Sequence, residues 1–321
     1  MTASTKRRPD IQALRAVAVS IVVAEHVLGQ PVGGFVGVDV FFVISGFLIV
    51  GLLLREYRRT GRINLVAFLG RRVRRLLPAA AVVVGVTVIA AYAVFPSGRA
   101  MQTGLDALWA TALLANWHFA AQQTDYFTAD GPVSPLQHLW SLSVEEQVYI
   151  VLPVLLVAVL AVTRRTGRPT TFAGVAMALI AAGSIAWALY ETATDPNAAY
   201  FSSAARAWEL GAGAMLAFGL DLWRRIPEAV ATVLRCSGFA TIIVAATIMD
   251  GTAGFPAPAA LVPVLGTALV LVSGSRSRPF GARLLAFPPL AGLGAISYSL
   301  YLWHFPYWSS RPPWRRARHG S

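Results

Sequence analysis

The sequence predicts an all-α, polytopic integral membrane protein with about nine transmembrane helices and one re-entrant or interfacial helix. Of its 321 residues, 56% are hydrophobic and 13% are charged, whereas a soluble protein carries ~25% charged residues. The mean hydropathy of the chain is +0.60. Several apolar runs are also long enough to cross the hydrocarbon core of a bilayer, which takes ~20 residues. The lipid bilayer is therefore the expected environment of most of the chain.

The basic residues indicate how the chain is oriented in the membrane. The formal net charge of +12 could suggest a nucleic-acid partner. However, the arginines gather in short runs between apolar segments, which is the pattern of cytoplasmic loops. The runs are 58–62, 71–75, 164–168, 224–225 and 276–283. We therefore expect no nucleic acid as a partner, and we place these runs and the N-terminus, with Lys6, Arg7 and Arg8, in the cytoplasm.

Nine spans follow when the basic runs are held on one side. The predicted spans are 11–28, 36–54, 76–95, 138–162, 171–190, 204–222, 229–249, 257–273 and about 284–306. The segment 104–121 is apolar enough to cross as well. If it crossed, every later basic run would change sides, so we predict that it is re-entrant or interfacial.

This arrangement gives one helical membrane domain over residues 1–306, with no soluble domain attached. The basic tail 307–321 then lies on the side away from the cytoplasm, against the charge rule. We expect this tail to be truncated or aberrant.

Ionisable residues inside apolar spans are costly, and each one is a functional candidate by default. The candidates are Arg15, Glu25, His26, Asp39, His138, Glu145, Glu146, Arg206, Glu209 and His304. Arg15 and His26 are eleven residues apart in the stretch "RAVAVSIVVAEH". On a helix they share one face and are separated by about 16 Å along the axis. A polar path across the membrane would carry side chains in this arrangement.

Six of the ten candidates also have a purely structural interpretation. Those interpretations are a snorkelling Arg15, a neutral His26 bonded to a carbonyl, an Arg206–Glu209 ion pair, a capping box of Ser143 and Glu146, and His304 in an interfacial aromatic belt.

The stretch "HLWSLSVEEQVY", residues 138–149, favours a functional site. Glu146 and Tyr149 are i,i+3 neighbours, while His138, Glu145 and Tyr149 fall near one stripe of the same helix. A carboxylate beside a phenol inside a membrane is hard to explain by packing alone. Which of the two glutamates is the functional one stays open at this point.

Cysteine and histidine usage argues against a metal or disulfide framework. The chain has one cysteine, Cys236, so it has no intramolecular disulfide, and its five histidines are scattered. We therefore predict no metal site.

Six stretches in order carry a resemblance to a known family. They are "RAVAVSIVVAEH", "GGFVGVDVFFVISGFLI", "FLGRRVRRLLPA", "HLWSLSVEEQVYIVLP", "RAWELGAGAMLA" and "ISYSLYLWHFP". Together they resemble the membrane acyltransferase-3 family of bacterial O-acyltransferases, from about residue 8 to residue 306. The resemblance implies a multi-pass enzyme of the bacterial plasma membrane with about ten spans. It implies transfer of an acyl group, usually acetyl, from cytoplasmic acyl-coenzyme A to a hydroxyl of a glycan, a glycolipid or a related acceptor.

The resemblance also implies roles for particular residues. Arg15 and His26 match the family's arginine–histidine motif, with His26 in the catalytic position. Its basic motif, thought to hold the acyl donor, is matched by Arg72 and Arg75, with Arg71 beside them. Glu146 and Tyr149 match its glutamate–tyrosine pair. No cofactor is expected to bind tightly, because acyl-coenzyme A is a substrate.

A mechanism follows from these roles. Arg71, Arg72, Arg74 and Arg75 suit the phosphates of coenzyme A, and Arg15 could steer the donor into a pore. His26 would be the general base for the acceptor hydroxyl or would carry the acyl group itself. Glu146 would fix the tautomer of His26 or serve as the base. Tyr149 would donate a hydrogen bond to the oxyanion.

Two other functions stay open from the sequence. Buried His, Glu and Arg residues also suit a proton-coupled transporter. The family's tenth span after residue 306 has no counterpart here, which would suit a truncated, inactive member. The inner arginines and the six ordered stretches favour the acyltransferase.

Overall fold

The computed structural model describes residues 8–124, 126, 133–251, 254–275, 285 and 287–309, and within these ranges all regular secondary structure is helical. The α-helices are α1 Pro9–Leu28, α2 Gly37–Thr60, α3 Leu65–Val94, α4 Ser97–Thr111, α5 Ala115–Ala121, α6 Leu139–Thr163, α7 Pro169–Thr194, α8 Pro196–Phe201, α9 Ser203–Phe218, α10 Leu220–Trp223, α11 Glu228–Ile248, α12 Leu261–Ser273 and α14 Pro288–Ser309. Short 3-10 helices cover Gly34–Val36 and Arg164–Thr166.

Six helical segments are long and apolar enough to cross a membrane. They comprise α1, α2 with the preceding 3-10 turn, α3, α6 with the following 3-10 turn, α7 and α11. The chain is therefore an all-helical, multi-pass membrane protein, as predicted. The predicted number of nine spans is not confirmed. Two of the other three predicted spans correspond to α9 and α12, which have 16 and 13 residues, fewer than the ~20 that a perpendicular span needs.

Local signals in the sequence set several helix ends. The Asn64 side chain accepts a hydrogen bond from the Ala67 backbone N–H at 2.9 Å and caps α3. Asp195 caps α8 in the same way. Gly61 ends α2 with φ of 71°, a left-handed conformation that glycine adopts at little cost.

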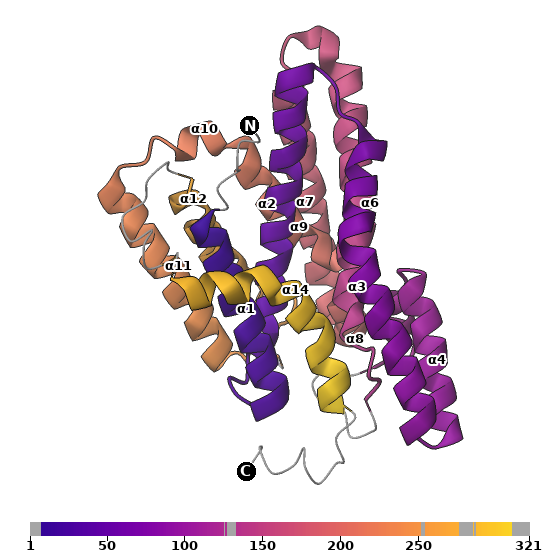
Figure 1. Cartoon of the computed structure of the whole chain (residues 1–321). Helices are drawn as coiled ribbons and strands as arrows, with labels where there is room; N and C mark the ends of the chain where they lie inside the picture. The colour runs from indigo at the N-terminus through magenta and orange to yellow at the C-terminus, as the bar shows by residue number, and fades with distance from the viewer. Residues whose placement is uncertain are drawn as a thin grey trace.

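The segment 104–121 contains parts of two helices, α4 and α5, where one was predicted. A turn separates them, and Leu113 within it has φ of 61°. With 15 and 7 residues, neither helix is long enough to cross a bilayer. Figure 1 shows α4 running back beside the end of α3, so it stays at one end of the molecule. This arrangement agrees with the prediction that 104–121 does not cross.

The basic runs gather at the other end of the molecule. Figure 1 shows the α2–α3 turn, the α6–α7 turn and α10 together at the upper end of the view. These turns carry the runs 58–62 and 164–168, and 224–225 directly follows α10. An ion pair of 3.0 Å between Arg58 and Asp221 joins the end of α2 to α10.

Two sequence predictions lie outside the described residues. The basic run 276–283 is one of them. The other concerns the tail 307–321, of which residues 310–321 are not described.

The core of the domain is centred on α2. In its spanning window 78% of the residues are buried, against 17% for α3 at the periphery. α2 and α9 pack without intervening side chains at Gly46 and Gly213. A Cβ at Gly46 would overlap the Leu210 carbonyl oxygen, and one at Gly213 would overlap the Val43 carbonyl oxygen. Glycine is therefore required at both positions.

A buried ion triad of Asp39, Arg206 and Glu209 joins α2 to α9. The Arg206 guanidinium lies 2.8 Å from Asp39 Oδ1 and 3.1 Å from Glu209 Oε1, and all three side chains are at most 1% exposed. The structural interpretation of Arg206 and Glu209 as an ion pair is confirmed. Asp39, which is 167 residues away from Arg206 in sequence, completes it.

Candidate active site

A cavity of about 580 Å³ opens between α1, α2, α3, α6 and α14. Its polar lining residues are Arg15, Ser45, Arg71, Arg72, Arg75, Ser141, Glu145, Tyr149, Ser297, Tyr298, Ser299 and Tyr301. Apolar side chains such as Phe41, Phe42 and Leu142 complete the wall. Four arginines against one glutamate give the lining a formal excess of three positive charges. An electropositive cavity of this kind favours an anionic ligand.

Three of the arginines come from one turn of α3. The helix is continuous from Leu65, so Arg71, Arg72 and Arg75 face the cavity while Arg74 does not line it. Among the described residues, neither Arg72 nor Arg75 has a carboxylate within ion-pair distance. The Arg72 guanidinium instead lies 4.3 Å from the centre of the Tyr149 ring, in a cation–π contact. These two guanidinium groups are available to an anion.

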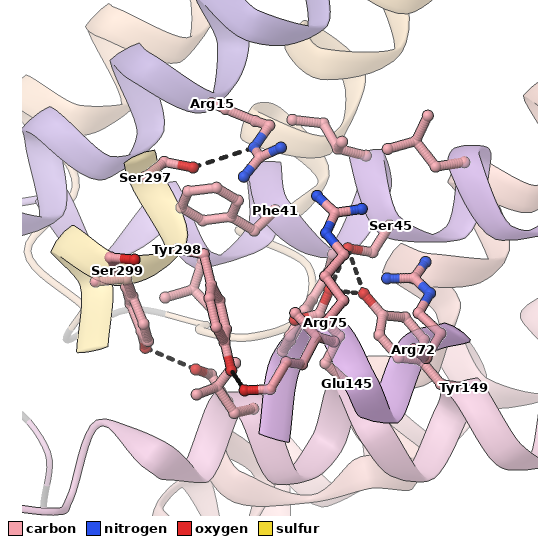
Figure 2. Close-up of a pocket in the computed structure, with 18 of the residues that line it drawn as sticks. Arg15, Phe41, Ser45, Arg72, Arg75, Glu145, Tyr149, Ser297, Tyr298 and Ser299 are labelled. Carbon is pink, nitrogen blue, oxygen red and sulfur yellow. Dashed lines mark hydrogen bonds between the residues drawn. The ribbon is translucent and has the colours of Figure 1, made fainter. Parts of the chain in front are cut away.

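Arg15 enters the same cavity from α1. Its Nε donates a hydrogen bond to Ser297 Oγ on α14 at 3.1 Å. Figure 2 shows Arg15 from α1 and Arg72 and Arg75 from α3 directed into one space. The structure thus brings Arg15 together with the predicted donor-binding arginines of α3, except Arg74, which does not line the cavity.

Glu145 is the carboxylate beside Tyr149. Ser45 Oγ donates to Glu145 Oε1, and the Tyr149 hydroxyl lies within hydrogen-bond distance of Glu145 Oε1 and, at 2.9 Å, of Ser45 Oγ (Figure 2). Glu146 neither lines this cavity nor makes a hydrogen bond or ion pair in the described part of the chain. The predicted pair of Glu146 with Tyr149 is therefore not formed, because the i,i+4 residue and not the i,i+3 residue points toward α2.

The start of α6 also excludes the capping box of Ser143 and Glu146. The helix begins at Leu139, so Ser143 lies within it. Ser143 Oγ donates to the Leu139 carbonyl oxygen at 3.2 Å and not to a free helix N–H.

His26 lies near the end of α1, outside the cavity lining. Its Nδ1 donates to the Val22 carbonyl oxygen at 2.7 Å, and its Nε2 lies 3.1 Å from the Tyr126 hydroxyl. Because a carbonyl oxygen can only accept, Nδ1 carries the proton and Nε2 presents its lone pair. The backbone of Val22 therefore fixes the tautomer, a role that the sequence predicted for Glu146.

Tyr126 is held as a hydrogen-bond donor at this position. It follows α5 and stacks on Tyr200, with ring centres 4.5 Å apart. Loss of water around the phenol raises the pKa of Tyr126, and the nearby charge of Glu25 raises it further. The phenol stays protonated at neutral pH and can donate to His26 Nε2.

Three imidazole rings, from His26, His138 and His304, form a histidine cluster. The ring centres of His26 and His304 are 5.1 Å apart, and those of His138 and His304 are 5.7 Å apart. His138 Nε2 donates to the Leu302 carbonyl oxygen at 3.1 Å, and His304 Nδ1 donates to that of Tyr301 at 2.6 Å. In the part of the chain that is described, no three His, Cys, Asp or Glu side chains are arranged to hold a metal ion.

The cavity and the histidine cluster meet at Ser141 and Tyr301. Both residues line the cavity, and both hydroxyls lie near the His138 carbonyl oxygen, at 3.2 Å and 3.0 Å respectively. The Tyr301 ring centre is 5.4 Å from that of His304. A path of neighbouring side chains therefore runs from the cavity of the α3 arginines through Tyr301 and His304 to His26.

Several hydroxyl-bearing residues of this path were missed from the sequence. They are Ser45, Ser141, Ser297, Tyr298 and Tyr301. A signal was present, since Ser297, Tyr301 and His304 are spaced i, i+4, i+7 and so share one face of α14.

Comparisons with known proteins bear on this site. A family model described as an acyltransferase domain matches residues 8–309. The chain is 33% identical over 315 residues to the peptidoglycan O-acetyltransferase OatA of Listeria monocytogenes, covering 94% of this chain and 50% of that protein. It is 32% identical over 308 residues to the putative peptidoglycan O-acetyltransferase YrhL of Bacillus subtilis, covering 93% and 48%.

A third relative extends the pattern. Identity to the O-acetyltransferase OatA of Staphylococcus aureus strain NCTC 8325 is 33% over 317 residues, covering 94% of this chain and 51% of that protein. The chain thus spans about half the length of the curated relatives it matches. No solved structure matches it. The match over nearly all of its length shows that this chain belongs to the membrane acyltransferase-3 family.

Proposed function

We propose that this protein is a membrane O-acyltransferase that moves an acyl group, most simply acetyl, from acyl-coenzyme A to a hydroxyl of a glycan. The observation that carries the proposal is the electropositive cavity that meets the histidine cluster at Ser141 and Tyr301. One end of this path suits a phosphorylated donor, and the other end holds a base.

The charge of the cavity suits coenzyme A. Its phosphates would bind Arg71, Arg72 and Arg75, because guanidinium forks match phosphate oxygens. These arginines lie toward the end of the molecule that carries the basic loops (Figure 1). Under the charge rule that end faces the cytoplasm, where acyl-coenzyme A is found. The N-terminus is then cytoplasmic.

The rest of the cavity lining suits the pantetheine arm. It combines apolar side chains with the hydroxyls of Ser297, Ser299 and Ser141. Hydroxyls can donate to and accept from the two amides of the arm, while the apolar groups pack against its methylenes. Glu145 and Tyr149 serve this donor site, since Tyr149 supports the Arg72 guanidinium.

His26 acts as the general base in the transfer step. An acceptor hydroxyl would displace the Tyr126 hydroxyl, which lies 3.1 Å from Nε2, and take its place at the Nε2 lone pair. Nε2 takes the proton of the acceptor hydroxyl while its oxygen forms a C–O bond to the thioester carbonyl carbon. The C–S bond then breaks, and the thiolate leaves toward the cavity and takes the proton from Nε2. The products are an O-acyl ester and free coenzyme A.

The acceptor is proposed from position and from the relatives. His26 lies near the end of α1 that points away from the basic loops. A hydroxyl on the outer side of the membrane would reach it. The relatives named as peptidoglycan O-acetyltransferases make a cell-envelope glycan the first acceptor to test.

The test is a thioester assay with the full chain in lipid nanodiscs. Purified protein, acetyl-coenzyme A and peptidoglycan fragments should yield free thiol and an acetylated glycan. His26→Ala should lower turnover by about 10³-fold, since a general base contributes 10²–10⁴-fold. Unchanged elution on size-exclusion chromatography controls for folding.

Two outcomes would overturn the proposal. One is near wild-type turnover by His26→Ala. The other is proton flux across vesicles with no thioester consumption, which would favour the proton-coupled transporter.

A further inference from the structure

We propose that Tyr301 is the specificity-determining residue that limits the length of the transferred acyl group. This inference rests on the proposed function and names a residue that separates the donor cavity from the catalytic histidine. The inference is based on one observation. The Tyr301 side chain lines the cavity and also contacts the histidine cluster.

The Tyr301 ring stands between the two parts of the path. It lines the cavity, where its ring centre is 6.3 Å from that of Phe41. Its ring centre is also 5.7 Å from that of His138 and 5.4 Å from that of His304. His304 in turn packs against His26 at 5.1 Å. A thioester that travels from the cavity toward His26 therefore meets the Tyr301 ring.

Hydrogen bonds fix the ring in this position. The Tyr301 hydroxyl lies 2.6 Å from Ser141 Oγ and donates to the His138 carbonyl oxygen at 3.0 Å. Tyr301 as a whole is only 7% exposed. A fixed aromatic ring in a close-packed interior resists displacement, because added methylenes force neighbouring side chains out of their preferred rotamers.

The size of the acyl group then decides whether it passes. Acetyl adds one methyl group beyond the thioester carbonyl, whereas butyryl adds two further methylenes. Each added methylene would have to occupy volume next to the Tyr301 ring. The ring therefore favours acetyl over longer acyl groups by exclusion.

Tyr298 provides a matched control on the same helix. It lines the same cavity three residues earlier, and its hydroxyl donates to the Leu76 carbonyl oxygen at 3.0 Å. Among the described residues, Tyr298 makes none of the ring contacts to the histidine cluster that Tyr301 makes. Truncation of Tyr298 should change donor affinity without changing the preference for acyl length.

The experiment compares kcat/KM for acetyl-, butyryl- and hexanoyl-coenzyme A. The enzymes are the wild type, Tyr301→Ala, Tyr301→Leu, Tyr301→Phe and Tyr298→Ala, each as the full chain in nanodiscs with peptidoglycan fragments as acceptor. Tyr301→Ala should raise the butyryl-to-acetyl ratio at least tenfold, and Tyr301→Leu should raise it less. Tyr301→Phe keeps the ring, so its butyryl-to-acetyl ratio should stay within twofold of the wild-type ratio. The ratio for Tyr298→Ala should also stay within twofold, although its donor affinity changes.

Three results would overturn the inference. They are an unchanged ratio in both Tyr301→Ala and Tyr301→Leu, an equal rise in Tyr298→Ala, or a full rise in Tyr301→Phe, which would assign the effect to the hydroxyl. If Tyr301→Ala does not elute as a single species, Tyr301→Leu and Tyr301→Phe decide between ring volume and hydroxyl.

The proposed function can fail separately. If the wild type consumes none of the three thioesters, the proposed function fails and this inference fails with it. If the wild type is active and the ratio does not respond to Tyr301, this inference alone fails.

Discussion

Arg206 and the cavity arginines carry the same guanidinium group in opposite surroundings. Arg206 is 1% exposed and has two carboxylates, those of Asp39 and Glu209, within 3.1 Å. Arg72 and Arg75 line an open cavity and, among the described residues, have no carboxylate within ion-pair distance. A buried arginine with its own counter-charges stabilises the fold, whereas one without them favours an anionic ligand. Charge balance around each arginine therefore separates structural from ligand-binding residues here, although all of them are costly inside a membrane.

The largest expected effect tests the structural half of this comparison. Arg206→Ala leaves Asp39 and Glu209 buried without a counter-charge, and breaking a buried ion pair in this way costs about 3–5 kcal/mol. The variant should give a low yield of monodisperse protein and a strongly lowered Tm. A wild-type Tm in Arg206→Ala would show that the triad does not stabilise the fold.

The next effect tests the ligand-binding half. Arg72→Ala and Arg75→Ala should each raise the KM for acetyl-coenzyme A by roughly 10- to 100-fold, since a hydrogen bond to a charged group contributes about 1.5–3 kcal/mol. The Tm and the KM for the acceptor should change little. Arg74→Ala, on the same turn but outside the cavity lining, is the control. Equal changes in the KM for the donor and the KM for the acceptor would show that the α3 arginines do not form the donor site.

A smaller effect distinguishes the two adjacent glutamates. Glu145→Gln weakens the hydrogen bonds from Ser45 and Tyr149 and so loosens the support of Arg72. A neutral hydrogen bond contributes about 1 kcal/mol, so kcat/KM for the donor should fall roughly five- to tenfold. Glu146→Gln should stay within twofold. The reverse order would restore Glu146 to the role implied by the family resemblance.

The smallest effect needs no mutation. A rise in ionic strength shortens the screening length from about 10 Å at 0.1 M to about 3 Å at 1 M. The KM for acetyl-coenzyme A should rise a few-fold over this range, because the cavity arginines bind an anion from solution. The Tm should stay constant, because the Arg206 triad is shielded from solvent. A fall in Tm with no change in KM would contradict this comparison, because the Arg206 triad and not the cavity arginines would then respond to salt.

The fold was predictable where apolar length decides it. Six of the nine predicted spans match helices that are long enough to cross a membrane. The break between α4 and α5 was missed because the sequence around Leu113, "TALLAN", holds no glycine or proline. The Arg206 triad could be predicted only in part. Glu209 is one turn away in sequence, whereas Asp39 is brought to Arg206 by the packing of α2 on α9.

The site shows the same division between local and tertiary information. Clustered arginines on α3 are a local pattern, and the structure places them in one cavity. The choice between Glu145 and Glu146 is not local, because either can meet Tyr149 on a helix. Ser45 on α2 selects Glu145, because its hydroxyl donates a hydrogen bond to that carboxylate. The tautomer of His26 is likewise set by the backbone carbonyl of Val22. Every residue has such a carbonyl, so the residue type gives no signal of this contact.

The glycine contact between α2 and α9 has a consequence for how such a chain can diversify. Gly46 and Gly213 each lie directly against the backbone of the opposite helix, so no larger residue fits at either position. Phe41 and Leu48 on α2 line the cavity, where there is open volume to accept change. Mutational tolerance along α2 is therefore confined to one side of the helix. Donor preference can drift through substitutions on that side while the opposite side keeps the helices in register.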